Sequence, residues 1–91
     1  MKKKKMKVKE FVDNSEHLMK LENDFIQSFI NLRKDKGLTQ QELGEASHVI
    51  RESIARIETL KVSPQVRTLL RILEPLGYTV SIVPIKKEKN K

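Results

Sequence analysis

Residues 37–58 constrain the fold of this chain more than any other stretch. Thr39 followed three positions later by Glu42 matches a capping box, in which each residue bonds the other's backbone at the start of a helix. A helix is therefore expected to begin at Gln40. Gly44 lies inside this helix, where glycine costs about 1 kcal/mol relative to alanine, which indicates that two helices cross closely at this position.

A second short helix is expected from Ile50 to Glu58, after a turn around His48. Its helical period places a mostly apolar set of side chains on the inner face, namely Ile50, Ser53, Ile54 and Ile57. The outward face near its start holds Arg51, Glu52, Ala55 and Arg56. Two short helices joined by a tight turn, with polar residues on the outside of the second helix, suit the major groove of DNA.

The longest helical pattern covers residues 16–36, with apolar residues at spacings of three and four. Gly37 supplies the left-handed residue that ends this helix. The part before Asp24 carries more apolar surface than so small a core needs, so it can serve as core, dimer contact or partner site. The residues of the amino-terminal part that we assign to a partner or dimer surface are Phe11, Leu18 and Leu21.

A further helix is expected to start at Ser63-Pro64, with serine as its cap and proline in its first turn, and to end at Gly77. The apolar face predicted for it consists of Val66, Leu69, Leu70, Leu73 and Leu76.

Residues 78–85 alternate β-branched and other residues with a period of two and predict a single strand. One strand finds no partner within its own chain. It is expected either to pair with its twin in a two-fold homodimer or to extend the sheet of another protein. The strand residues assigned to this contact are Tyr78, Val80 and Ile82.

The net charge of +7 is carried by the two ends of the chain. Lysines dominate residues 1–9 and 86–91, whereas residues 10–85 have a net charge of −2. The lysine-rich ends are either arms that follow phosphates or solubilising tails. A DNA-binding surface on the rest of the chain must therefore come from the local placement of a few cations.

Several classes of function find no support in the sequence. The 91 residues suffice for one small domain. Without cysteine there is neither a disulfide nor a thiolate site, and the two histidines belong to no catalytic or metal-binding motif. We therefore expect no enzyme activity, cofactor, metal or small-molecule substrate. No apolar run could span a membrane, and a cytoplasmic location is expected.

Three stretches carry a family resemblance: Gly-Leu-Thr-Gln-Gln-Glu-Leu from residue 37, Ile-Ala-Arg-Ile-Glu from residue 54, and Ser-Pro-Gln-Val-Arg-Thr-Leu-Leu-Arg-Ile-Leu from residue 63. They resemble the Xre/Cro-type helix-turn-helix domain. With the ending Leu-Gly-Tyr-Thr-Val-Ser-Ile-Val-Pro-Ile, the chain more narrowly resembles HigA-type antitoxins. Four residues depart from the family pattern. His48 stands where many relatives have glycine, Ile50 stands where they have serine or threonine, and Thr59-Leu60 stands where they have a turn with asparagine or glycine.

The resemblance implies an all-α fold of five helices with a carboxyl-terminal strand. It also implies a homodimer that binds a palindromic DNA operator and neutralises a RelE-fold, HigB-type toxin. Gln40 matches the family's phosphate contact, and Ser53 and Lys61 are expected to touch phosphate as well. The positions of the base contacts match Arg51, Glu52, Ala55 and Arg56.

The expected organisation has five parts: a lysine-rich arm (1–9), a helical extension (10–23), the DNA-binding domain (24–77), the strand (78–85) and a basic tail (86–91). Two other functions remain open from the sequence. One is a stand-alone Xre-family transcription regulator, and the other is a protein-interaction module on a helix-turn-helix scaffold.

Overall fold

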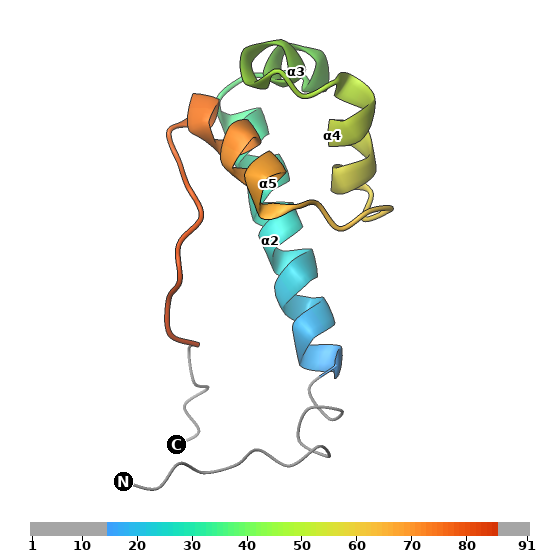
Figure 1. Ribbon diagram of the computed structural model, residues 1–91, viewed down its shortest axis with the longest axis vertical. Coiled ribbons are helices and arrows are strands. Elements are labelled where there is room, and N and C mark those ends of the chain that lie inside the picture. Colours follow the sequence, from blue (N-terminus) through green and yellow to red (C-terminus); the bar gives the residue numbers. More distant parts are fainter. Residues whose placement is uncertain (1–14, 86–91) are drawn as a thin grey trace, which may run out of the picture.

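The computed structural model describes residues 15–85, which form four α-helices and one short 3₁₀ helix. These elements are α2 (Ser15–Asp35), α3 (Gln40–Ser47), α4 (Arg51–Glu58), α5 (Val66–Leu73) and η1 (Glu74–Leu76). Figure 1 shows that α2 is long and that the other helices lie beside its second half. The predicted all-α class is confirmed. The lysine-rich arm, the basic tail and Phe11 lie outside the described residues.

The core lies where the second half of α2 meets α3, α4, α5 and η1. Its fully buried side chains are Leu43, Ile54, Ile57, Ile72 and Leu76. From α2 only Ile26, Phe29 and Arg33 are buried. The first half of α2 extends beyond this core, and Leu18 and Leu21 are 58% and 45% exposed there. Within the described residues 15–85, the apolar surface before Asp24 is therefore not part of the core.

A buried ion pair ties α2 to the end of α4. Arg33 Nε donates to Glu58 Oε2 at 2.7 Å, and Arg33 Nη2 donates to Glu58 Oε1 at 2.9 Å. The remaining nitrogen, Nη1, donates to the Leu38 carbonyl at 2.7 Å. Two parallel charge-assisted bonds fix the orientation of both side chains, so the pair sets the position of α4 on α2.

The helix after α4 begins later than expected. Its first residue is Val66, with Gln65 in the cap position, so the predicted start at Ser63-Pro64 is wrong. The Ser63 hydroxyl instead donates to Glu22 Oε2 at 3.0 Å, and this bond links the α4–α5 loop to α2.

The buried face of α5 and η1 agrees only in part with the predicted one. Leu73 and Leu76 are buried and Leu69 packs against the core, as expected. Val66 and Leu70, however, are 61% and 41% exposed, and Ile72, which was not expected on the apolar face, is fully buried. The predicted end of this region is confirmed, since Gly77 has a φ of 86° after η1.

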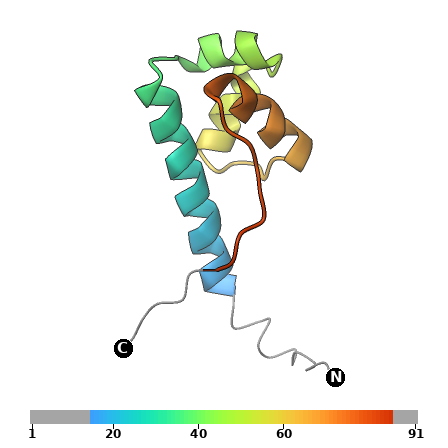
Figure 2. The same cartoon turned by 90° about the vertical axis from the view of Figure 1, so that its left-hand side faces the viewer.

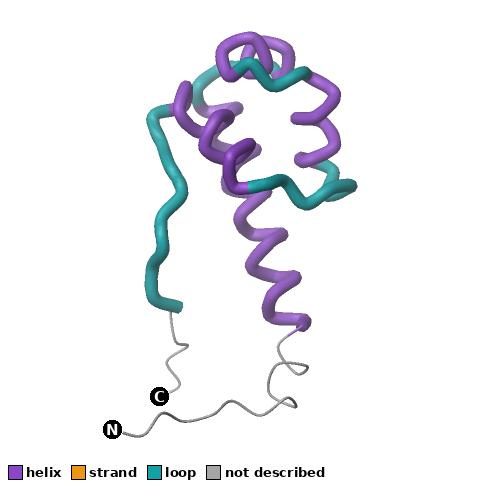
Figure 3. The backbone as a smooth tube through the Cα atoms, viewed as in Figure 1, coloured by secondary structure: helices purple, strands orange, loops and turns teal. Residues whose placement is uncertain are grey.

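Residues 78–85 form no strand within the described part of this single chain (Figure 3). They leave η1 and run back in the direction of the exposed half of α2 (Figures 1 and 2). A lone extended segment has no backbone ladder to join, so its pairing with a second molecule remains a prediction. Residues 15–85 contain four α-helices and the short helix η1, so the predicted count of five helices is not confirmed for the described part of the chain. No helix in this part of the chain is long and apolar enough to cross a bilayer.

Candidate nucleic-acid interface

The start of α3 is capped as the sequence predicts. The Thr39 hydroxyl accepts from the Glu42 backbone N–H at 3.0 Å, and the Thr39 N–H donates to Glu42 Oε1 at 2.9 Å. Both bonds of the capping box are therefore present, and the helix begins at Gln40. Because the cap fixes two of the free N–H groups, the first turn of α3 is a rigid support for the residues that follow.

The turn between α3 and α4 depends on Gly44. A Cβ atom at this position would lie 2.7 Å from the Val49 carbonyl oxygen and 3.3 Å from the Arg51 nitrogen. The turn reverses at His48, whose φ is 62°. Gly44 is therefore a point of close approach, but the atoms it meets belong to the backbone of the turn and of the first residue of α4, and no crossing of helix bodies is involved. The missing side chain lets the turn fold against α3 and brings the start of α4 beside it.

The outward residues near the start of α4 lie as predicted. Arg51, Glu52 and Arg56 are exposed and Ala55 is half-buried, while Ile54 and Ile57 lie in the core behind them. Ile50 is the exception. It was predicted on the inner face, but it is the cap residue, with φ and ψ of −63° and 149°, and its side chain is 67% exposed. An extended residue ahead of the first turn does not follow the helical period.

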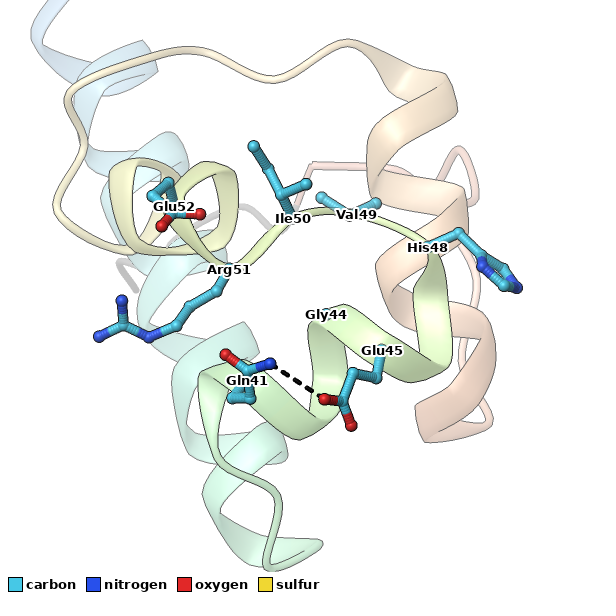
Figure 4. A pocket seen from close by; sticks show the side chains of 8 residues that line it. All are labelled: Gln41, Gly44, Glu45, His48, Val49, Ile50, Arg51 and Glu52. Atoms are coloured by element: carbon cyan, nitrogen blue, oxygen red, sulfur yellow. Dashed lines mark hydrogen bonds between the residues drawn. The ribbon is translucent and has the colours of Figure 1, made fainter.

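A surface groove of about 490 Å³ is lined by residues of α3, of the turn and of the start of α4 (Figure 4). On the α3 side, Gln41 Nε2 donates to Glu45 Oε2 at 3.0 Å. On the α4 side, Arg51 and Glu52 line the same groove. Gln41 and Glu45 were not predicted as neighbours of the base-contact candidates. Both are exposed on α3, and their helical spacing indicates exposure to solvent without indicating that α4 lies beside them.

The three phosphate-contact candidates occupy different environments. Lys61 is exposed, and Ser53 and Gln40 are half-buried. Gln40 Nε2 donates to Glu58 Oε1 at 2.9 Å, so the Arg33–Glu58 pair also holds this side chain. An amide nitrogen has two hydrogens, so a second donor of Gln40 is left for another acceptor.

Leu60, in the turn after α4, has a φ of 61°. Next to it, the Lys61 N–H donates to the Arg56 carbonyl at 2.9 Å and closes the turn. Asparagine or glycine, the residues expected in this turn from the sequence resemblance, would tolerate the left-handed conformation better than leucine does.

The partner-surface candidates lie apart from the start of α4. Leu18 and Leu21 lie on the first half of α2, and Tyr78 and Ile82 are 56% and 98% exposed on the final segment. Val80 is half-buried against the core. The first half of α2 points away from α3 (Figure 1), although Lys61, at the other end of the interface, lines a hollow together with Met19 and Glu22 of this half.

Comparison with known proteins assigns the chain to a family. A family model described as Helix-turn-helix matches residues 30–83. A Haemophilus influenzae protein named as an uncharacterised HTH-type transcriptional regulator is 44% identical over 61 residues, which cover 67% of this chain and 62% of that protein. The chain thus spans less than two thirds of that relative.

A solved structure, named as a toxin–antitoxin module from Streptococcus pneumoniae, matches with a TM-score of 0.62 and 33% identity. The match covers 89% of this chain and 84% of the other. These similarities agree with the capped α3, the turn at Gly44 and the position of α4. The chain belongs to the helix-turn-helix family, as its Xre-type sequence motifs indicate.

Proposed function

We propose that this protein is a sequence-specific DNA-binding transcription regulator that acts through α3, the following turn and α4. One observation carries the proposal. The start of α4 presents exposed Arg51, Glu52 and Arg56, while Ile54 and Ile57 of the same helix are buried in the core. A helix held in this way can enter the major groove with its side chains directed at base edges.

The chemistry of the exposed side chains supports distinct roles. Arg51 can donate two bonds to guanine O6 and N7, and Glu52 can accept a bond from cytosine N4. Arg56 and Ala55, one turn further along α4, complete the proposed base-contacting set. Gln40, Ser53 and Lys61 are proposed to hold phosphates, which fix register without reading sequence.

We further propose that the working unit is a homodimer on a palindromic operator. Two α4 helices related by a two-fold axis would meet successive major grooves about 34 Å apart. The exposed apolar side chains of residues 78–85, with Ile82 98% exposed, support pairing of this segment with its twin, since residues 15–85 of one chain offer it no ladder partner.

The toxin–antitoxin role extends this proposal. Similarity to a toxin–antitoxin module from Streptococcus pneumoniae and the HigA-like sequence support an antitoxin that represses its own operon and neutralises a RelE-fold toxin. We propose that Leu18 and Leu21 belong to the toxin-binding surface, with Phe11 ahead of them. The half of α2 that carries Leu18 and Leu21 points away from α3 (Figure 1), so a toxin bound there would leave the base-contacting start of α4 free.

The DNA-binding proposal is tested by comparing two variants on the selected operator and on unrelated duplexes. Arg51→Ala should cost about 1–3 kcal/mol on the operator and relax preference at one base pair. Gln40→Ala should weaken binding to all duplexes alike. Lys20→Ala, which alters an exposed pair with Asp24 on α2, is the control. Equal effects of both variants on every sequence would contradict direct reading by Arg51.

The antitoxin proposal is tested by co-expression with the product of a neighbouring gene of RelE-like sequence. The two proteins should co-purify, and the antitoxin should restore growth. Leu18→Lys with Leu21→Lys should break the complex and leave DNA binding intact. The regulator relative from Haemophilus influenzae supports a second candidate, a stand-alone regulator, which would bind the operator and form no such complex.

A further inference from the structure

Ile50 occupies an unusual place in the interface. It is the cap residue directly before Arg51, and its side chain makes no capping hydrogen bond. The side chain is 67% exposed, although its neighbour Val49 is half-buried against the core. A large apolar side chain is therefore presented to solvent at the very start of α4.

Neither stability nor local structure accounts for isoleucine at this position. The bonds that begin α4 run from the Ser53 and Ile54 N–H groups to the Ile50 carbonyl, at 3.0 and 3.3 Å, and any residue supplies that carbonyl. Serine, threonine, asparagine or aspartate would add a side-chain cap. Because the Ile50 side chain is mostly in water, little burial offsets the missing cap.

The neighbours of Ile50 indicate what its side chain meets. Three consecutive residues line the edge of the groove between α3 and α4, and their side chains point in different directions (Figure 4). They are Ile50, Arg51 and Glu52. A duplex that places Arg51 and Glu52 against base edges therefore brings Ile50 to the same stretch of major groove. The apolar group that base pairs display there is the C5 methyl of thymine.

We infer that Ile50 is a specificity-determining residue that contacts the C5 methyl group of a thymine beside the base pair read by Arg51. The inference rests on the proposed DNA binding and adds an apolar contact to its polar ones. The contact would make isoleucine useful at a position where the fold alone favours a capping residue.

The test removes the methyl group alone. A duplex is selected from an unmodified random pool with the full-length protein, and each thymine is then replaced in turn by deoxyuridine. At one position in each half-site, deoxyuridine should weaken wild-type binding about fourfold, the factor expected for loss of one buried methyl group. In Ile50→Ser, the affinity ratio between the thymine and deoxyuridine duplexes should fall to about one. The new serine could bond a phosphate, but such a bond would strengthen binding to the thymine and deoxyuridine duplexes equally and would leave their affinity ratio unchanged.

Two further variants complete the experiment. Ile50→Val keeps the branched methyl groups and should preserve the ratio. Val66→Ser removes an exposed apolar side chain at the start of α5, away from the start of α4, and should leave the ratio at its wild-type value. Urea unfolding of each variant shows that it is folded at the temperature of the binding assay.

The outcomes separate the two proposals. If selection enriches no sequence, the proposed function fails and this inference fails with it. If an operator is found but no thymine is sensitive to deoxyuridine, the inference alone is wrong. Sensitivity that persists in Ile50→Ser would assign the methyl contact to another residue such as Ala55. Unchanged ratios together with loss of a protein partner in Ile50→Ser would place Ile50 in a protein contact and overturn the inference.

Discussion

At two turn residues, the backbone conformation limits which amino acids fit without strain. His48 and Leu60 have φ values of 62° and 61°, in the left-handed region where a Cβ atom crowds the following carbonyl oxygen. Leu60 is also 46% exposed, so burial of its side chain does little to offset this cost. The departures from the family pattern at these two positions are thus local costs with a defined origin.

Leu60→Gly is expected to raise the free energy of unfolding by about 1 kcal/mol, because glycine adopts the left-handed conformation without the Cβ penalty. Urea unfolding measures the change. Leu60→Ala is the matched control: it removes the same side chain and keeps the Cβ atom. Equal stability of the two variants would show that the backbone conformation is not the cause.

Gly44→Ala is expected to lower the free energy of unfolding by about 1–3 kcal/mol. The new Cβ would lie 2.7 Å from the Val49 carbonyl oxygen, a backbone atom that can move only if the turn is rebuilt. This clash outweighs the gain of about 1 kcal/mol in helix propensity. Glu45→Ala, at the exposed next position, should change stability little. A Gly44→Ala protein as stable as wild type would contradict the close approach.

At the scale of elements, the Glu58 side chain of α4 forms hydrogen bonds that link this helix to α2 and α3. It accepts two bonds from Arg33 and one from Gln40. The side chains of Arg33 and Glu58 are 9% and 7% exposed. One carboxylate thus links the long helix to both helices of the interface, and its loss affects the geometry of the interface as well as stability.

Glu58→Ala should lower the free energy of unfolding by about 3–5 kcal/mol, because it leaves a buried guanidinium without its partner. Replacing the pair by apolar residues, as in Arg33→Met with Glu58→Leu, should cost less than Glu58→Ala alone. Thermal or urea unfolding of the single and double variants measures the difference. Lys20→Ala, in a pair that is exposed on both sides, should have little effect. A Glu58→Ala loss as small as that of Lys20→Ala would refute the role of the buried pair.

Across the whole molecule, charge and function are distributed unequally. The nine lysines and arginines of residues 15–85 are matched by nine acidic residues, so the excess charge lies in the two ends of the chain. The interface groove itself includes the acidic residues Glu45 and Glu52 beside Arg51. General attraction to DNA is therefore expected to depend on the lysine-rich ends, and sequence reading on α4.

Replacing the six lysines of residues 1–9 by glutamine should weaken binding to all duplexes and leave base preference unchanged. The slope of log affinity against log salt should become shallower by about 0.9 for each lysine that contacts a phosphate. Binding titrations at several salt concentrations measure this slope. An unchanged slope would identify the lysines as a solubilising segment.

Ile82→Asp should shift the protein from dimer to monomer, because it places a charge in the proposed contact between two copies of residues 78–85. Analytical ultracentrifugation over a range of protein concentrations measures the equilibrium. Val66→Asp is the control, since it adds the same charge at an exposed residue of α5. A dimer that persists in Ile82→Asp would remove this segment from the subunit contact.

The sequence by itself determined the features that depend on neighbours a few residues apart. The capping box at Thr39, the left-handed glycines that follow α2 and η1, and the inward Ile54 and Ile57 of α4 all belong to this class. Their cause is local: a cap, a backbone conformation or a helical period acts within one or two turns. The family motif follows from the same local features.

Only the tertiary structure decided the rest. Arg33 and Glu58 meet across 25 residues of sequence, and no local pattern predicts such a pair. Ile50 left the predicted inner face because it lies before the first helical turn, and the buried face of α5 was set by its packing against α3. Residues 78–85 have a strand-like pattern, but a strand exists only with a partner for its backbone hydrogen bonds, and that partner is not within the described part of one chain.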